Sequence, residues 1–146
     1  MPTDPEFLRE LSCFRNLSDD QLNSIAEITN AVCYPPDTIL FEEGKPGLRL
    51  FFLVRGDVEV FHNFGEADQV PVDRVSGEEV VGCSALIEPF TYTATERSMT
   101  EVEVLEVDAA SLRELMQHDY RLALPIQQHI IRVLMDRVQE LRRKAA

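Results

Sequence analysis

The sequence lacks long apolar runs and has few cysteines, and both features exclude whole classes of protein. No stretch approaches the roughly 18 apolar residues that a membrane span requires, and the opening residues MPTDPEFLRE have no basic or apolar signal segment. The three cysteines, Cys13, Cys33 and Cys83, are odd in number and widely spaced, so they offer neither a disulfide framework nor a CxxC metal site. We therefore expect a soluble, cytoplasmic protein without a membrane partner, whose thiols are reduced and mostly buried.

Basic residues are also scarce, with 14 Lys and Arg against 26 Asp and Glu and a net charge of −12. They gather in residues 132–146, where five basic residues stand against two acidic ones, a local charge of +3. The rest of the chain is strongly acidic and repels phosphate backbones, so we expect no nucleic-acid binding by this chain alone. The basic end is interpreted as cations placed favourably at a helix C-terminus.

Motifs for catalysis are missing as well. The sequence contains no GxSxG elbow, no HExxH motif and no Walker loop. A cupin-like metal enzyme, the remote alternative, needs clustered histidines, but only His62 falls on an expected strand, and His118 and His129 lie in the helical end. The acid pairs Glu42-Glu43 and Glu78-Glu79 stand beside turn glycines and are interpreted as solvated loop charges. We expect neither enzymatic activity nor a metal site.

The apolar pattern predicts a single domain in three parts: helices in residues 1–30, a β-barrel in 31–108 and helices in 109–146. Many short strands separated by Gly, Pro and Asn turn signals favour a mainly β fold, an antiparallel barrel of the jelly-roll (double-stranded β-helix) type, over a parallel sheet. The expected strands are 31–34, 38–41, 50–55, 58–62, 69–75, 93–98 and 102–107.

Helix signals flank these strands. Ser18 followed by Gln21 forms a capping box before an apolar face. A short helix is expected to begin near Asp108, and a long one to begin after a break at Pro125 and to end near Arg143. The apolar positions of the long helix form one stripe. They are Ile126, Ile130, Val133, Leu134, Val138 and Leu141.

Residues 38–61, TILFEEGKPGLRLFFLVRGDVEVF, resemble the first hallmark of the cyclic nucleotide-binding domain family. This is the effector domain found in the catabolite activator protein and in protein kinase regulatory subunits. The glycines of the motif permit tight turns with positive φ, and the apolar run between them fills the barrel. The resemblance covers nearly the whole chain and implies a non-enzymatic regulatory or sensor domain in signal transduction. The matched features are Phe41, Gly44, Gly47, Leu50–Val54, Gly56 and Val58.

Residues 77–98 resemble the second hallmark of the family, the phosphate-binding cassette, but depart from it at two positions. In ligand-binding members a Gly-Glu pair opens a short helix whose amides hold the phosphate. The glutamate binds the ribose 2′-hydroxyl, and an arginine further along neutralises the phosphate. Here Gly82 matches, but Cys83 stands at the glutamate position and Tyr92 at the arginine position. The cassette is degenerate in its charges, although its scaffold is intact.

The resemblance nevertheless implies a set of candidate ligand-binding residues. The amides of Ser84 and Ala85 would face an anion, Thr93 fits the small polar pattern that follows the arginine, and Arg137 would lie near the base. The full set is Gly82, Cys83, Ser84, Ala85, Tyr92, Thr93 and Arg137.

Structural roles are the alternative for the two substituted positions. Tyr92 would pack its ring in the barrel with its hydroxyl in water, and Cys83 would be a small buried hydrophobe. Other arginines are poor replacements for the missing one. Arg97 is expected on the opposite face of its strand. Arg49 and Arg55 could reach the rim of a pocket, though a solvated position is favoured for both.

Three functions remain open at this point. The domain is a sensor of cAMP or cGMP with weakened recognition, a sensor of a different and less charged small ligand in the same pocket, or a ligand-free dimerisation or relay module. The apolar stripe and the family resemblance predict a homodimer through the long C-terminal helix. Restoring the two family residues, by Cys83→Glu and Tyr92→Arg, is expected to recover affinity for cAMP.

Overall fold

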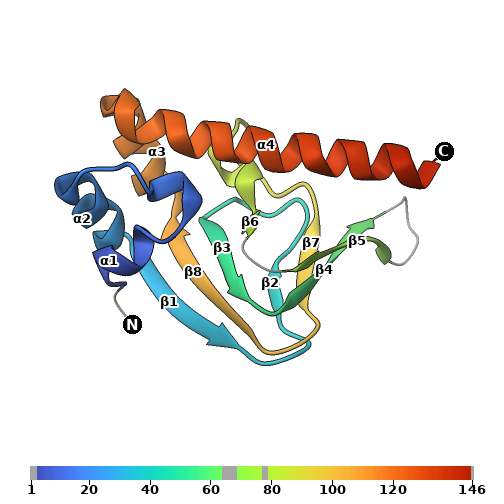
Figure 1. Ribbon diagram of the computed structural model, residues 1–146. Coiled ribbons are helices and arrows are strands. Elements are labelled where there is room, and N and C mark those ends of the chain that lie inside the picture. Colours follow the sequence, from blue (N-terminus) through green and yellow to red (C-terminus); the bar gives the residue numbers. More distant parts are fainter. Residues whose placement is uncertain (1–2, 64–68, 77–78, 146) are drawn as a thin grey trace.

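The computed structural model describes residues 3–63, 69–76 and 79–145, and its strands form two four-stranded antiparallel sheets (Figure 1). The strand orders are β1-β8-β3-β6 and β2-β7-β4-β5. A mainly β fold between helices is therefore confirmed, whereas pairing that would join the two sheets into one closed barrel is not seen among the described strands. The strands are β1 (Thr29–Tyr34), β2 (Ile39–Phe41), β3 (Arg49–Arg55), β4 (Asp57–Asn63), β5 (Gln69–Ser76), β6 (Glu79–Val81), β7 (Thr95–Ser98) and β8 (Val102–Asp108).

Strand β3 explains the apolar run at the centre of the first hallmark. Leu50 and Phe52 belong to the core cluster formed with the helices, and Phe51 and Leu53 belong to the cluster between the two sheets. All four side chains are at most 4% exposed. Because successive side chains of a strand point to opposite faces, this run buries both faces of the first sheet.

The helices cover the outer face of the first sheet and one end of both sheets. In Figure 1, α4 crosses the molecule from the side of α3 and the N-terminal helices towards β5. Along the described chain no helix is both long and apolar enough to cross a membrane. The helices are α1 (Pro5–Leu8), η1 (Ser12–Phe14), α2 (Asp19–Glu27), η2 (Cys83–Leu86), α3 (Ala109–His118) and α4 (Tyr120–Ala145).

The predicted helix starts at Ser18 and Asp108 are confirmed. The Ser18 hydroxyl accepts from the Gln21 amide at 3.2 Å, and the Gln21 side chain accepts from the Ser18 amide at 2.9 Å. Asp108 accepts from the backbone of Ser111 at 3.0 Å and thereby caps α3. Such reciprocal bonds satisfy amides that have no partner within the helix.

The predicted start of the long helix at Pro125 is wrong. Helix α4 begins at Tyr120, where Asp119 accepts from the amides of Arg121 and Leu122, and it continues through Pro125. The proline removes one hydrogen bond near the N-terminus, and the cap together with the packing of the helix outweighs that loss. The remaining strand differences are small: β1 begins at residue 29 and β7 at residue 95, and the short β6 was not predicted.

Two smaller expectations also need correction. Cys33 on β1 is exposed, whereas Cys13 is buried and Cys83 half-buried. Gly44 and Gly56 have positive φ as expected, but Gly47 does not. Gly47 is required for space instead, because a Cβ there would lie 2.7 Å from the Cα of Ala85.

Candidate ligand pocket

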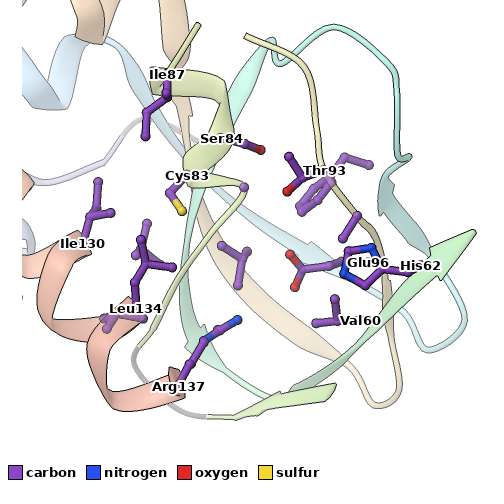
Figure 2. A pocket seen from close by; sticks show the side chains of 16 residues that line it. Val60, His62, Cys83, Ser84, Ile87, Thr93, Glu96, Ile130, Leu134 and Arg137 are labelled. Atoms are coloured by element: carbon purple, nitrogen blue, oxygen red, sulfur yellow. The ribbon is translucent and has the colours of Figure 1, made fainter. Parts of the chain in front are cut away.

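A cavity of about 320 Å³ lies where η2, β7 and α4 meet, and Figure 2 shows the side chains around it. Its wall combines a polar edge with a larger apolar area from the sheets and from α4. A cavity of this size and character is typical of a small-molecule site. The lining residues are Phe41, Val60, His62, Val80, Val81, Gly82, Cys83, Ser84, Ile87, Thr93, Ala94, Glu96, Ile130, Val133, Leu134 and Arg137.

The cassette turn forms one side of this cavity. Gly82 adopts the left-handed conformation, with φ 75° and ψ 22°, which a residue with a Cβ rarely adopts. It is followed by the 3₁₀ turn η2, in which the Ala85 amide donates to the Gly82 carbonyl at 3.0 Å. Gly82, Cys83 and Ser84 line the cavity, whereas Ala85 is completely buried behind it. The Ala85 amide, which was expected to face an anion, is therefore used inside the turn.

Cys83 stands at the rim where a ligand-binding relative has its glutamate. Its side chain is half-buried and points towards the cavity from the start of η2 (Figure 2). Burial raises the pKa of the Cys83 thiol, and the opposing effect of Arg137 is smaller. The thiol is therefore neutral near pH 7 and supplies no charge to the site.

Tyr92 does not line this cavity. Its ring is 6% exposed and stacks on Phe41 with centroids 4.3 Å apart. Its hydroxyl donates to the Arg49 carbonyl at 2.7 Å and accepts from the Arg49 amide at 3.1 Å. The ring thus packs in the core as the structural alternative predicted, but its hydroxyl is bonded to the backbone rather than placed in water.

The arginines considered as replacements lie away from the cavity. Arg49 pairs with Glu106 at 3.4 Å, and Arg55 lies 3.7 Å from Glu101 and 3.8 Å from a second glutamate. Arg97 lies over the ring of Phe61, 4.8 Å from its centroid. The prediction that Arg97 faces away from the pocket agrees with this position.

Arg137 contributes a guanidinium group to the lining of the cavity. It comes from α4 and donates to Glu79 of β6 at 2.8 Å. Figure 2 shows its side chain rising from the helix towards the cavity, across from Ser84 and Thr93. The structure therefore brings together five of the seven predicted residues around one cavity, and leaves Ala85 and Tyr92 behind its wall.

Sequence reasoning missed Glu96 and the apolar roof of the cavity. Glu96 lies on β7, is only 6% exposed and directs its carboxylate into the cavity (Figure 2). His62 lies beside it, and its Nδ1 is 3.1 Å from the carboxylate of Glu43. Alternation along the chain places Glu96 on the same face as Ala94, but it does not tell which face is internal, so this signal alone did not reveal Glu96. The roof comes from Ile130, Val133 and Leu134 of α4.

Comparisons with known proteins agree with this geometry. The model of the family described as "Cyclic nucleotide-binding domain" matches residues 31–119, which confirms the resemblance seen in the two hallmarks. A cAMP-dependent protein kinase regulatory subunit of Pyricularia oryzae is 29% identical over 110 residues, covering 75% of this chain and 27% of that protein. A CRP-like cAMP-activated global transcriptional regulator of Mycobacterium tuberculosis is 21% identical over 108 residues, covering 74% and 48%. The chain thus spans half or less of the length of these curated relatives.

A solved structure matches almost end to end. The crystal structure of a candidate cyclic nucleotide-binding protein from Geobacter metallireducens superposes with a TM-score of 0.82 at 29% identity. The match covers 93% of this chain and 98% of that one. The overall fold is therefore shared over nearly the whole chain.

Proposed function

The chain belongs to the cyclic nucleotide-binding domain family, and we propose that it is a regulatory sensor domain, not an enzyme, whose ligand binds in the cavity beneath α4. The observation that carries the proposal is that three parts of the fold that are distant in the chain share one cavity wall: the cassette turn, strand β7 and helix α4. A ligand there contacts the sheets and the helix together. Its binding free energy therefore depends on the position of α4, which is the requirement for a sensor.

Recognition of cyclic nucleotides is weakened in this proposal. A phosphate that leaves water needs compensation for its charge, and hydrogen bonds from a charged donor contribute about 1.5–3 kcal/mol against about 1 kcal/mol for neutral ones. The cassette turn supplies the neutral Cys83 and Ser84, and the family's arginine position is occupied by the buried Tyr92. We expect cAMP and cGMP to bind with a Kd near 1 mM, about −4 kcal/mol.

A homodimer through α4 is the second part of the proposal. The exposed side of α4 carries an apolar row at the spacing of a coiled-coil seam: Leu124, Ile131 and Val138 are seven residues apart, and Leu134 and Leu141 each lie three residues after a member of this series. Each is at least 44% exposed. Pairing this row with the same row of a second protomer would place the ligand cavity next to the dimer interface. A shift of α4 would then be transmitted between the protomers.

Calorimetric titration of nucleotide-free protein with cAMP and cGMP tests the sensor proposal. Arg137→Gln, which changes a lining residue, should abolish the weak heat of binding. Arg132→Gln, an exposed change on the same helix, should leave it unchanged. Equal effects of both variants would show that binding does not occur in this cavity.

A further inference from the structure

Arg113 of α3 is bonded to the cassette turn. Its guanidinium donates to the Ala85 carbonyl at 2.5 Å and lies over the ring of Phe90, 4.1 Å from the ring centroid. Carbonyls at the end of a helical turn have no partner within it, so Arg113 satisfies one that would otherwise be buried without a hydrogen bond. Among the residues that the structure describes, Arg113 forms no ion pair with a carboxylate. The cassette is therefore what orients this side chain.

The segment from Ala85 to Phe90 is held at both of its ends. From the loop that precedes β3, the Gly47 amide donates to the Phe90 carbonyl at 2.6 Å, and the lack of a side chain at Gly47 lets Ala85 pack against it. From α3, Arg113 contacts the same two residues. Ile87, between them in the chain, is 61% exposed and lines the cavity (Figure 2). A ligand that displaces this segment therefore acts on Arg113.

Helix α3 can respond to a ligand only indirectly. The structure describes the helix over its whole length, and none of its side chains lines the cavity. It is nevertheless closely joined to α4, because Asp119, the residue after α3, caps α4. Leu112 of α3 is buried in the same core cluster as Leu122 and Ile126 of α4. A movement of α3 therefore changes the packing of α4.

We propose that Arg113 is the positioning residue that transmits ligand binding in the cavity from the cassette turn to α3, and through the packing of α3 to α4. The inference rests on the proposed function, because it takes ligand binding beneath α4 as given, and it assigns a second route by which that binding reaches the helices. A guanidinium suits this role because it donates to a backbone carbonyl and stacks on an aromatic ring at the same time. One side chain thereby joins both ends of the loop to the helix.

Amide NMR shifts during a titration with cAMP test the proposal, because they report on the two elements separately. The Gly82 amide reports binding at the cavity, and the Leu115 amide reports the response of α3. Both signals should shift together in the unmodified protein. Arg113→Met keeps an apolar stem beside Phe90 but removes the guanidinium, so the Gly82 shift should remain and the Leu115 shift should be lost. The matched control Arg121→Met removes an exposed guanidinium from the first turn of α4 and should preserve both shifts.

The outcomes separate this inference from the proposed function. If Arg113→Met retains the Leu115 shift, or if Leu115 does not respond in the unmodified protein while Gly82 does, this inference is overturned and the sensor proposal stands. A purely structural role for Arg113 would lower the unfolding midpoint without separating the two signals. If cAMP shifts neither signal at about ten times the expected Kd, both proposals are overturned.

A second variant covers the case in which Arg113→Met fails to give a cooperative thermal transition. Arg113→Lys keeps a charged donor but lacks the planar group that stacks on Phe90. It should therefore weaken the Leu115 shift relative to the Gly82 shift. An undiminished Leu115 shift in this variant would overturn the role assigned to the guanidinium.

Discussion

The ring of Tyr92 stacks on that of Phe41 at a centroid distance of 4.3 Å, and its hydroxyl is bonded to both backbone groups of Arg49. Phe41 in turn stacks on Phe51 at 5.6 Å. The position at which the family carries its phosphate-binding arginine is therefore part of the core between the sheets. Burial raises the pKa of Tyr92, so its hydroxyl remains protonated and donates throughout the neutral range.

Tyr92→Phe should destabilise the fold although the ring is retained. The substitution removes two hydrogen bonds to the Arg49 backbone and should lower the free energy of unfolding by about 1–2 kcal/mol. Urea unfolding measures the loss. The matched control is Tyr120→Phe, which removes a hydroxyl from a side chain that is 83% exposed and should change stability by less than about 0.5 kcal/mol. Equal losses in the two variants would contradict the role assigned to the Tyr92 hydroxyl.

Much of the fold could be predicted because its signals are local. The capping box at Ser18 and the apolar run Leu50–Val54 each follow from a short stretch of sequence, and both are confirmed. Pro125 misled the prediction because proline is common at the first position of a helix, whereas here α4 begins five residues earlier, at Tyr120, and Asp119 caps it. Whether a helix passes through a proline depends on its packing, which a single segment does not reveal.

The candidate site was harder to predict, because its wall joins segments that are distant in the chain. The resemblance to the family motif located Gly82 and Cys83, which line the cavity. It also selected Tyr92, whose side chain does not line the cavity because its ring stacks on Phe41 in the core. Glu96 was missed because strand alternation defines two faces without telling which is internal. Only the pairing of β7 between β2 and β4 shows that Glu96 faces the cavity.

Protonation of His129 should weaken the attachment of α4. The pKa of His129 is lowered from 6.5, mainly by burial and then by Arg132, with Glu79 acting in the opposite direction. Because the folded state binds this proton less readily than the unfolded chain, stability is retained above pH 6.5 and is lost as the pH falls through the lowered folded-state value. Urea midpoints measured from about pH 7.5 to about pH 5 should therefore decrease.

The His129→Gln variant should show a smaller decrease over the same range. His118→Gln provides the control, because His118 is exposed at the end of α3 and its loss should leave the pH dependence unchanged. A decrease of the same size in His129→Gln and in the unmodified protein would show that another group is responsible.

Dimerisation should depend on the exposed row of α4. Ile131 is 56% exposed and lies in the seam, so Ile131→Glu would place two carboxylates opposite each other in a dimer. Light scattering at tens of micromolar should give a dimer for the unmodified protein and a monomer for Ile131→Glu. Gln139→Glu adds the same charge one position past the seam residue Val138 and should remain dimeric. A monomeric unmodified protein would exclude the homodimer.

The restoration of cAMP binding depends on positions 83 and 92, of which only the first lines the cavity. Cys83 already lines the cavity, so a glutamate there can reach a ribose hydroxyl directly. An arginine at position 92 must leave the stack on Phe41 before it can reach a phosphate, and it removes the hydrogen bonds to Arg49. The double variant Cys83→Glu with Tyr92→Arg should therefore unfold at a lower urea concentration than the unmodified protein, yet bind cAMP more tightly.

The gain expected from a guanidinium fork on the phosphate and an acceptor for the 2′-hydroxyl is on the order of 3–5 kcal/mol, or about two to four decades in Kd. Calorimetry with cAMP measures it, after circular dichroism has shown that the variant is folded. Cys33→Glu with Tyr120→Arg is the matched control, because it makes the same two changes at exposed positions and should not improve binding. A folded double variant without affinity would mean that the cavity cannot admit the nucleotide. Micromolar binding by the unmodified protein would mean that another cation, with Arg137 the nearest on the wall, already serves the phosphate.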